Sequence, residues 1–201
     1  EVDFVMEGRE IELDREILEE LADPLIHLLR NAIDHGLERP AEREAAGKAP
    51  AGRLVLRAAR ERSSVLIEVS DDGRGVARGK VLGRARELGL VGEGEGLDDD
   101  ALLRLLSQPG LSTAERVTDL SGRGVGLDVV VNRIRALGGA IALHTEEGRG
   151  TTFSLRLPTT LALMQALRIR VGGEDYAIPL THIAEAVVLE PGVVEVVDGR
   201  E

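Results

Sequence analysis

The sequence predicts a mixed α+β fold, and three observations carry that prediction. Apolar residues recur at helical spacing through residues 15–35 and again through 127–137. Of two glycine-rich turns, the one at 71–75 follows a strand-like segment and the one at 122–126 opens a helical segment. Apolar and polar residues alternate, as in half-buried strands, in segments 53–60, 64–70, 140–145 and 151–157. This pattern alone does not single out one α+β fold.

Composition limits the function classes. The chain has 201 residues, 43% of them hydrophobic and 1% aromatic, so one domain or slightly more can bury an aliphatic core. The lack of aromatic side chains disfavours base stacking, and the net charge of −11 argues against nucleic acid as the main partner. The absence of cysteine excludes disulfides, thiolate zinc sites and cysteine nucleophiles. No apolar run approaches the ~20 residues that cross a bilayer, and the acidic, strand-like start predicts no signal peptide.

The N-terminal elements follow from local patterns. Residues 2–6 and 11–13 alternate apolar and polar side chains and predict two short strands joined by a turn at Gly8. Asp14 is expected to cap the long helix that begins at residue 15.

Two residues are expected to shape that helix. Pro24 interrupts its apolar pattern and predicts a kink or break near Asp23, and Gly36 is expected to end it as a left-handed cap. Residues 37–52 predict a loop with a short helix. Residues 77–120 form a long connection, which predicts a functional lid or a mobile loop.

The C-terminal part reads as a separate unit. Pro158 ends the last strand of the first unit, and strand-like segments then flank a turn at Gly172. We expect residues 1–158 to form one domain and residues 159–201 to be the first part of a second, β-rich domain.

The long helix carries the first candidate site. His27, Asn31 and, about one turn on, His35 share a face at i, i+4 spacing. An amide oxygen suits Mg²⁺ that is held mainly by phosphates and waters. The alternative is a helix face that is merely solvated. The other histidines, His144 and His182, lie in or after strand-like segments and are expected to be structural or on the surface.

The second candidate is the turn Asp-Asp-Gly-Arg-Gly at the end of an apolar strand. A carboxylate at a buried strand end, here Asp71, can accept a hydrogen bond from an exocyclic amine such as that of adenine. Gly73 and Gly75 would let the backbone approach a flat base. The alternative is an ordinary Asp-Gly turn.

The third candidate is the glycine-rich run 121–127 before a helix, where backbone N–H groups and the helix dipole favour an anion. Its spacing matches neither the dinucleotide fingerprint nor the Walker P-loop, and a flexible helix-entry turn would look the same. The fourth candidate, Thr151 after Gly150, is by itself only a turn followed by a strand residue.

In combination these motifs resemble the GHKL ATP-binding family, and most closely the CheA-like chemotaxis histidine kinases. Segments 25–36, 71–76, 109–113 and 120–130 are similar to the family's N, G1, F and G2 boxes, in that order. The resemblance covers about residues 2–158. It implies an α/β two-layer sandwich of the GHKL (Bergerat) type, with ATP between helices and lid. Beyond Pro158 the chain is similar to the start of a CheW-like, SH3-like regulatory domain.

The resemblance implies an ATP-binding role for residues of several motifs. Asp71 would bind the adenine amine with Thr151 beside it, and Asn31 would coordinate Mg²⁺ on the triphosphate. The ATP-binding residues that it implies are Asn31, Asp71, Gly73, Gly75, Lys80, Ser121, Gly122, Arg123, Gly124, Val125, Gly126, Leu127 and Thr151.

Four residues are implied to act at the γ-phosphate: His27, Asn31, His35 and Lys80, the last by neutralising developing charge. One residue departs from the family pattern. Leu111 stands where the F box carries Phe, and we expect this apolar side chain still to anchor the lid.

Two other function classes stay open. A GHKL ATPase clamp resembles this chain but places Glu four residues before the motif Asn, to activate water. Here His27 stands at that position, which favours transfer of the γ-phosphoryl to an external histidine. A nucleotide-binding adaptor with decayed catalysis is the second class, and the intact Asn31 and Asp71 argue against it.

The resemblance also implies partners. These are ATP, a phosphotransfer domain of the same kinase that lies outside these residues, response regulators, and a CheW-type adaptor and chemoreceptors bound through the CheW-like domain. The full-length protein would be a cytoplasmic homodimer associated with membrane chemoreceptor arrays, with no nucleic-acid partner.

Overall fold

The computed structural model describes residues 1–92, 97–108, 126–159, 166–179 and 183. The chain divides into two compact units, Glu1–Ala162 and Leu163–Glu201.

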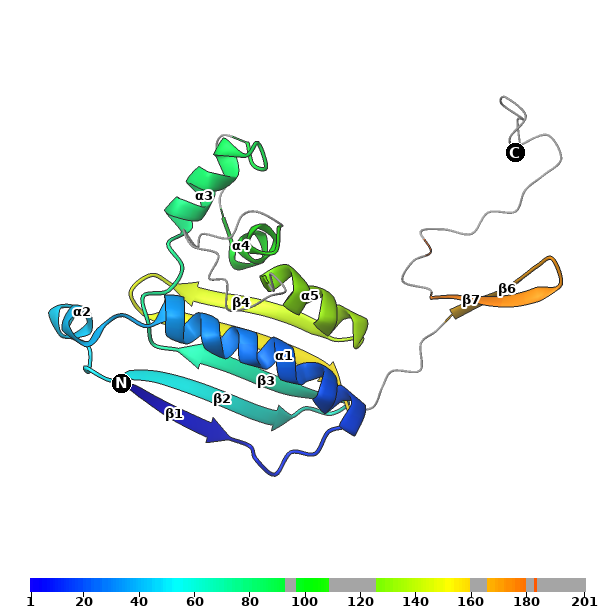
Figure 1. The fold of residues 1–201 in the computed structure, drawn as a ribbon, viewed down its shortest axis with the longest axis horizontal. Coiled ribbons are helices and arrows are strands. Elements are labelled where there is room, and N and C mark those ends of the chain that lie inside the picture. Colours follow the sequence, from blue (N-terminus) through cyan, green and yellow to red (C-terminus); the bar gives the residue numbers. More distant parts are fainter. Residues whose placement is uncertain (93–96, 109–125, 160–165, 180–182, 184–201) are drawn as a thin grey trace. The chain divides into compact units, whose positions relative to one another are not determined.

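The first unit is built on a five-stranded mixed sheet with strand order β1-β2-β3-β5-β4 (Figure 1). β1 runs parallel to β2, and the other neighbouring pairs are antiparallel. The strands are β1 (Val2–Glu7), β2 (Gly52–Arg60), β3 (Ser64–Asp71), β4 (Ala140–Glu146) and β5 (Gly150–Pro158).

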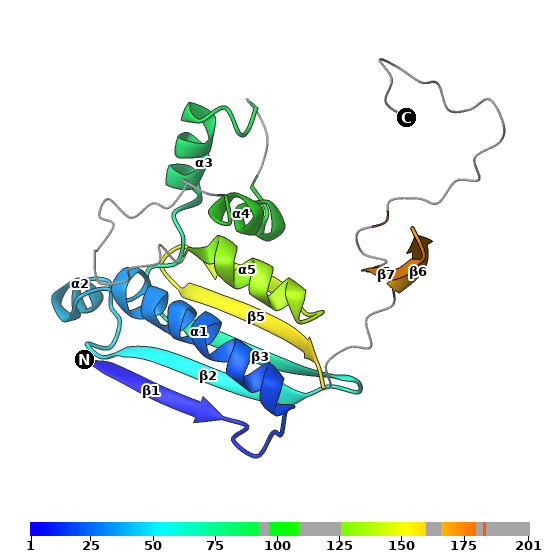
Figure 2. The same cartoon turned by 45° about the vertical axis from the view of Figure 1, so that its right-hand side comes forward.

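Helices α1 and α5 lie side by side over one face of this sheet in both views (Figures 1 and 2). The described helical segments are α1 (Arg15–Asn31), the π-helical turn η1 (Ala32–Gly36), α2 (Pro40–Ala45), α3 (Arg78–Glu87), α4 (Asp99–Leu106) and α5 (Leu127–Ala136). The two-layer α/β sandwich expected from the sequence is confirmed.

The core between the sheet and the helices is aliphatic, as the composition predicts. Burying each such side chain contributes about 1.5–3 kcal/mol, so this layer is the main source of stability. Its fully buried members include Ile17, Leu21, Leu28, Leu54, Val65, Val69, Ile134, Leu155 and Leu157. A smaller cluster joins α3 and α4 to α5 and β4 through Val81, Ala85, Leu102, Val131 and Leu143.

Most predicted elements of the first unit are confirmed. The four alternating segments form β2, β3, β4 and β5, and α2 is the short helix expected in the loop that precedes β2. Asp14 caps α1, since its carboxylate accepts from the backbone N–H of Glu16 at 2.9 Å. α5 is followed by Gly138 at a φ of +71°, the left-handed conformation typical of a glycine that ends a helix.

Two expectations for the N-terminal part are wrong. Residues 11–13 form no strand, because Ile11 and Leu13 instead pack, partly buried, against the core from an irregular segment. α1 does not break near Asp23 but continues through the buried Pro24, whose neighbours Leu21 and Leu28 anchor the helix in the core.

The prediction for Gly36 is also wrong. Its φ is not in the left-handed region, and the residue that ends the π-helical turn is the extended Leu37. Gly36 instead lies against the carboxylate of Asp71, since a Cβ at this position would be a tight 3.1 Å from Oδ1.

The described part of the second unit is a hairpin of β6 (Ala166–Val171) and β7 (Glu174–Pro179). Gly172 and Gly173 form its turn at φ values of +60° and +88°. Asp175 forms ion pairs with Arg168 and Arg170 across the two strands. The SH3-like fold of this unit and the boundary at residue 158 stay predictions.

None of the helices in the described ranges combines the length and the apolarity that a membrane crossing needs.

Candidate functional site

Asp71 is the last residue of β3 and forms the centre of the candidate site. It is paired with Leu54 on β2 and with Thr151 on β5. Its Oδ1 accepts from the backbone N–H of Gly73 at 2.9 Å. Burial raises the pKa of Asp71 to about 6, although hydrogen bonds from the backbone N–H groups of Gly73 and Thr151 lower it. The site therefore holds a partly buried hydrogen-bond acceptor at the end of the central strand β3.

Backbone crowds this carboxylate so closely that side chains are excluded. A Cβ at Gly73 would lie 2.2 Å from the carbonyl oxygen of Gly36. The backbone N–H of Arg74 donates to that same oxygen at 2.8 Å. Gly75 adopts a φ of +67°, and a Cβ there would meet the Glu146 carbonyl oxygen at 2.3 Å. The two glycines thus let the turn after β3 lie directly against the end of η1 and the end of β4.

Thr151 is buried and its hydroxyl is tied to a residue that the sequence did not single out. The hydroxyl oxygens of Thr145 and Thr151 lie 3.1 Å apart. Thr145 also donates to the Gly150 carbonyl at 3.1 Å and accepts from the Val76 N–H at 2.9 Å. Since a hydroxyl has one proton, Thr151 is then the donor in the pair, and its oxygen keeps a lone pair for a ligand or water.

The polar face of α1 ends in the π-helical turn. Asn31 is the last residue of α1 and is half-buried, and the N–H of Leu37 donates to the carbonyl of Ala32 at 2.8 Å. The extra residue per turn moves His35 out of the regular i, i+4 row that the sequence predicted. Such turns are frequent at functional sites, and nothing in the sequence pattern announces this one.

His27 is half-buried and faces several charges. Its pKa is lowered by burial first and then by the charge of Arg30, while Asp128 on α5 opposes that shift and His35 adds to it. The structure therefore brings His27, His35 and the first turn of α5 into electrostatic range of one another. The imidazole of His27 is uncharged at neutral pH.

The structure describes only some of the remaining predicted site residues. Lys80 lies exposed in the first turn of α3. Gly126 is the N-cap of α5, and Leu127 is its first residue. Ser121, Gly122, Arg123, Gly124 and Val125 lie outside the described residues, as do Leu111 and His182.

His144 lies on β4 with an exposed side chain, as expected for a residue outside the motifs. Its Nδ1 is 2.9 Å from Oδ2 of Asp99 on α4. Arg78 pairs with the same Asp99 and donates to the carbonyls of Leu97 and Thr145 at 2.7 and 3.1 Å. These contacts tie α3 and α4 to β4 beside Thr145.

A buried ion network behind the Asp71 turn was missed by the sequence analysis. Arg43 on α2 is 1% exposed and pairs with Asp72 and Glu38 at 2.8 and 3.1 Å. Lys48 pairs with Glu38 at 2.8 Å. The one available signal was that the chain has only two lysines, one of which stands in this polar loop.

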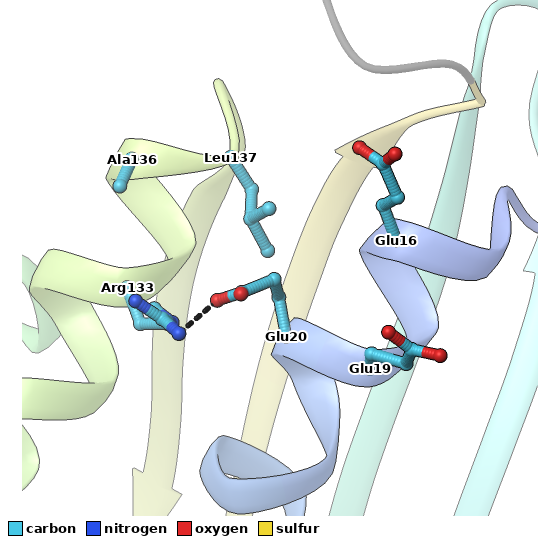
Figure 3. Close-up of a pocket in the computed structure, with 6 residues that line it drawn as sticks. All are labelled: Glu16, Glu19, Glu20, Arg133, Ala136 and Leu137. Atoms are coloured by element: carbon cyan, nitrogen blue, oxygen red, sulfur yellow. Dashed lines mark ion pairs between the residues drawn. The ribbon is translucent and has the colours of Figure 1, made fainter.

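A hollow between α1 and α5 contains none of the predicted site residues (Figure 3). Glu20 and Arg133 form an ion pair across it, as the dashed line shows (Figure 3). Its lining residues are Glu16, Glu19, Glu20, Arg133, Ala136 and Leu137. The chemistry of the motifs therefore lies at the other end of α1, beside Asp71.

Comparison with known proteins finds similar sequences over most of this chain. The model of the family described as histidine kinase-, DNA gyrase B-, and HSP90-like ATPase matches residues 20–161. "Chemotaxis protein CheA" of Bacillus subtilis is 45% identical over 185 residues, which are 91% of this chain and 28% of the relative. The protein of the same name from Halobacterium salinarum is 45% identical over 203 residues, 100% of this chain and 30% of the relative. The chain thus spans less than a third of the length of these relatives.

Among solved structures, the catalytic domain of histidine kinase ThkA in a nucleotide-free form is 18% identical at a TM-score of 0.47, covering 80% of each chain. The family model spans most of the first unit, including Asn31, Asp71 and Thr151. This chain belongs to the histidine kinase-, DNA gyrase B- and HSP90-like ATPase family, and its first unit is an ATP-binding domain of that family.

Proposed function

We propose that this chain is the catalytic ATP-binding part of a chemotaxis histidine kinase, which passes the γ-phosphoryl of Mg-ATP to a histidine on a separate phosphotransfer domain. The observation that carries the proposal is the similarity to CheA proteins over 91–100% of the chain, together with the partly buried Asp71 carboxylate at the glycine-lined end of the central strand β3.

The adenine end of the proposed site is the turn after β3. One oxygen of Asp71 is occupied by the Gly73 N–H, and the carboxylate is left with capacity to accept from the 6-amino group of adenine. Thr151 supports the same carboxylate through its backbone N–H. A guanine presents an oxygen at that position, so a carboxylate there favours adenine.

The phosphate end of the proposed site lies along α1 and α5. No group of three histidine, aspartate or glutamate side chains able to hold a metal occurs among the described residues. A cation would therefore arrive with the phosphates, and the amide oxygen of Asn31 fits the hard oxygen ligands that Mg²⁺ prefers. When bound, Mg²⁺ neutralises charge on the triphosphate. Lys80 and the glycine-rich run 122–126 before α5 complete the proposed anion site.

We place His27 and His35 near the γ-phosphate. The half-buried, uncharged His27 stands where ATPase clamps resembling this family carry a water-activating Glu. Without that carboxylate, the site positions the phosphate and leaves attack to an external nucleophile. In the proposed transfer, a lone pair of the acceptor imidazole forms the P–N bond as the P–O bond to ADP breaks.

The proposed partners are those of the whole kinase. They comprise its phosphotransfer domain, response regulators, a CheW-type adaptor and chemoreceptors, with the full-length protein a cytoplasmic homodimer at receptor arrays. The negative net charge of −11 supports the absence of a nucleic-acid partner.

Calorimetric titration of Mg-ATP into this chain tests the binding step. We expect saturable binding that is absent with GTP and is lost or strongly weakened in the Asp71→Asn variant. A folded chain that binds neither nucleotide, or an unchanged preference for ATP over GTP in the variant, contradicts the adenine assignment.

Incubation with ATP and a purified phosphotransfer domain tests the reaction. We expect an acid-labile phosphoprotein, as a phosphohistidine gives, with little free phosphate. Release of phosphate without labelled protein would support the ATPase reading instead. A dimeric longer kinase serves as the positive control, because dimerisation raises the effective concentration of the acceptor.

A further inference from the structure

The loop between η1 and β2 contacts the turn after β3 from behind. α2 ends at Ala45, and Gly47 adopts a φ of +74°, with nothing near the position of a Cβ. The N–H of Lys48 then donates to the carbonyl of Arg43 at 2.8 Å. This reversal of the chain sends the side chains of Arg43 and Lys48 to the same place, the backbone of residues 72 and 73.

Lys48 donates to two consecutive carbonyls of the turn. Its Nζ lies 2.9 Å from the oxygen of Asp72 and 2.7 Å from the oxygen of Gly73. Arg43 adds a bond of 3.3 Å to the Asp72 oxygen. The Asp72 carboxylate is held at the same time, by Arg43 at 2.8 Å and by the backbone N–H of Arg53 at 2.8 Å.

The geometry of one peptide group connects these contacts to Asp71. The carbonyl of Asp72 and the N–H of Gly73 belong to the same trans peptide and point in opposite directions. Because Lys48 and Arg43 hold the carbonyl outward, the N–H of Gly73 points inward, where it meets Oδ1 of Asp71 at 2.9 Å. Lys48 and Arg43 thereby set how the Asp71 carboxylate presents its second oxygen.

Lys48, Arg43 and Glu38 carry charges that compensate one another. Glu38 accepts from Lys48 with one oxygen and from Arg43 with the other, at 2.8 and 3.1 Å. Burial alone would raise the pKa of Glu38, but its hydrogen bond to Lys48 and the two cations hold the pKa below its usual range. No buried side-chain polar atom among the described residues lacks a partner. Such a satisfied network is rigid, which suits a positioning role.

We infer that Lys48, supported by Arg43 and Glu38, is a positioning residue for base recognition, which sets the orientation of the Asp71 carboxylate toward the 6-amino group of a bound adenine nucleotide. The inference rests on the proposed function of Asp71 as the adenine acceptor. Lys48 acts on the ligand only through the backbone of residues 72 and 73.

The test compares ATP with purine riboside triphosphate, which lacks only the 6-amino group, in calorimetric titrations. For Lys48→Met we expect the affinity for ATP to fall about tenfold and that for the purine nucleotide to change less than about twofold, since one oriented hydrogen bond is lost. Lys48→Arg keeps the charge and the donors, and we expect it to restore part of the preference for ATP. Arg57→Met is the matched control, because Arg57 is an exposed cation on β2 that pairs only with Glu7 and Glu68 in the described structure.

Each possible result of these titrations supports or overturns the role of Lys48 or that of Asp71. Equal loss of affinity for the two nucleotides, or no loss, would overturn the inference, since a merely structural role of Lys48 weakens both alike. Failure of the unchanged chain to prefer ATP over the purine nucleotide would instead remove the proposed role of Asp71. Lys48, which is 18% exposed, is chosen over the fully buried Arg43 so that the variant folds.

Discussion

At the scale of single residues, two demands conflict at Asp71. A buried carboxylate binds its proton more tightly in the folded protein than in the unfolded chain, and its pKa is raised from 3.8 to about 6. Its contribution to stability is therefore fully present below about pH 3.8 and is lost as the pH rises through about 6. At neutral pH the ionised carboxylate, which the proposed adenine recognition requires, destabilises the nucleotide-free fold.

The Asp71→Asn variant separates these demands. We expect the gain in free energy of unfolding of the variant over the unchanged chain to be about 1–3 kcal/mol larger at pH 7.5 than at pH 4. Denaturant unfolding without nucleotide at the two pH values measures this. A difference between variant and parent that is equal at both pH values would contradict the buried, raised carboxylate.

Asn31 offers a second test at this scale. For Asn31→Ala we expect Mg-dependent ATP affinity to fall by more than about tenfold and phosphoryl transfer to be abolished, because the proposed ligand of the cation is removed. The free energy of unfolding should change little, within about 0.5 kcal/mol, since Asn31 is only half-buried. Titrations with Mg²⁺ and with EDTA measure the metal dependence.

The matched control for that variant is Asn132→Ala, which changes an exposed asparagine on α5. An Asn31 variant with unchanged Mg²⁺ dependence would remove the metal assignment. An equal loss in the Asn132 variant would indicate a general effect on α1 and α5.

At the scale of elements, β2 to β5 were predicted well, whereas the strand expected at 11–13 and the end of α1 were not. Alternation suffices for β2 to β5 because each has one face in the core, which makes the period of two visible in sequence. The π-helical turn η1 ends at Gly36, which lies against the Asp71 carboxylate, a contact between residues 35 positions apart that no local pattern records. For the same reason Gly36 was misread as a local cap.

The residues of the candidate site likewise differ in whether a local sequence pattern could reveal them. Asn31, Asp71 and Thr151 belong to motifs and could be named from the sequence. Lys48 acts on backbone carbonyls, which every residue possesses, so its target leaves no trace in the sequence.

Arg78 provides the test at this scale, since it joins α3 to α4 and β4. In the Arg78→Met variant we expect amide hydrogen exchange in α4 to accelerate about tenfold or more, because charge-assisted bonds to Asp99 and to the carbonyls of Leu97 and Thr145 are lost. Exchange in β3 and β5 should stay unchanged. Arg84→Met, which removes an exposed pair with Glu87 on the same helix, is the control. Equal protection of α4 in the two variants would show that Arg78 does not hold it.

At the scale of the whole molecule, the described core of the first unit is complete before its last strand ends. The last buried core residue is Leu157, and the boundary between the units falls after Ala162. We therefore expect a chain that ends at Pro158 to keep the free energy of unfolding of the full sequence. Its affinity for Mg-ATP should lie within about twofold of that of the full sequence. Calorimetry and denaturant unfolding of both chains measure this. A shortened chain that unfolds or loses ATP would show that residues 159–201 belong to the catalytic unit.

The one-sided arrangement of helices over the sheet has a practical consequence. Ala142 is exposed on β4 and pairs with Ser154 on the face opposite to α1 and α5. Because the chain contains no cysteine, an Ala142→Cys substitution creates a single thiol. A dye or spin label attached there lies on the side of the sheet away from these helices, where it can report ligand binding and partner docking without entering the proposed nucleotide site.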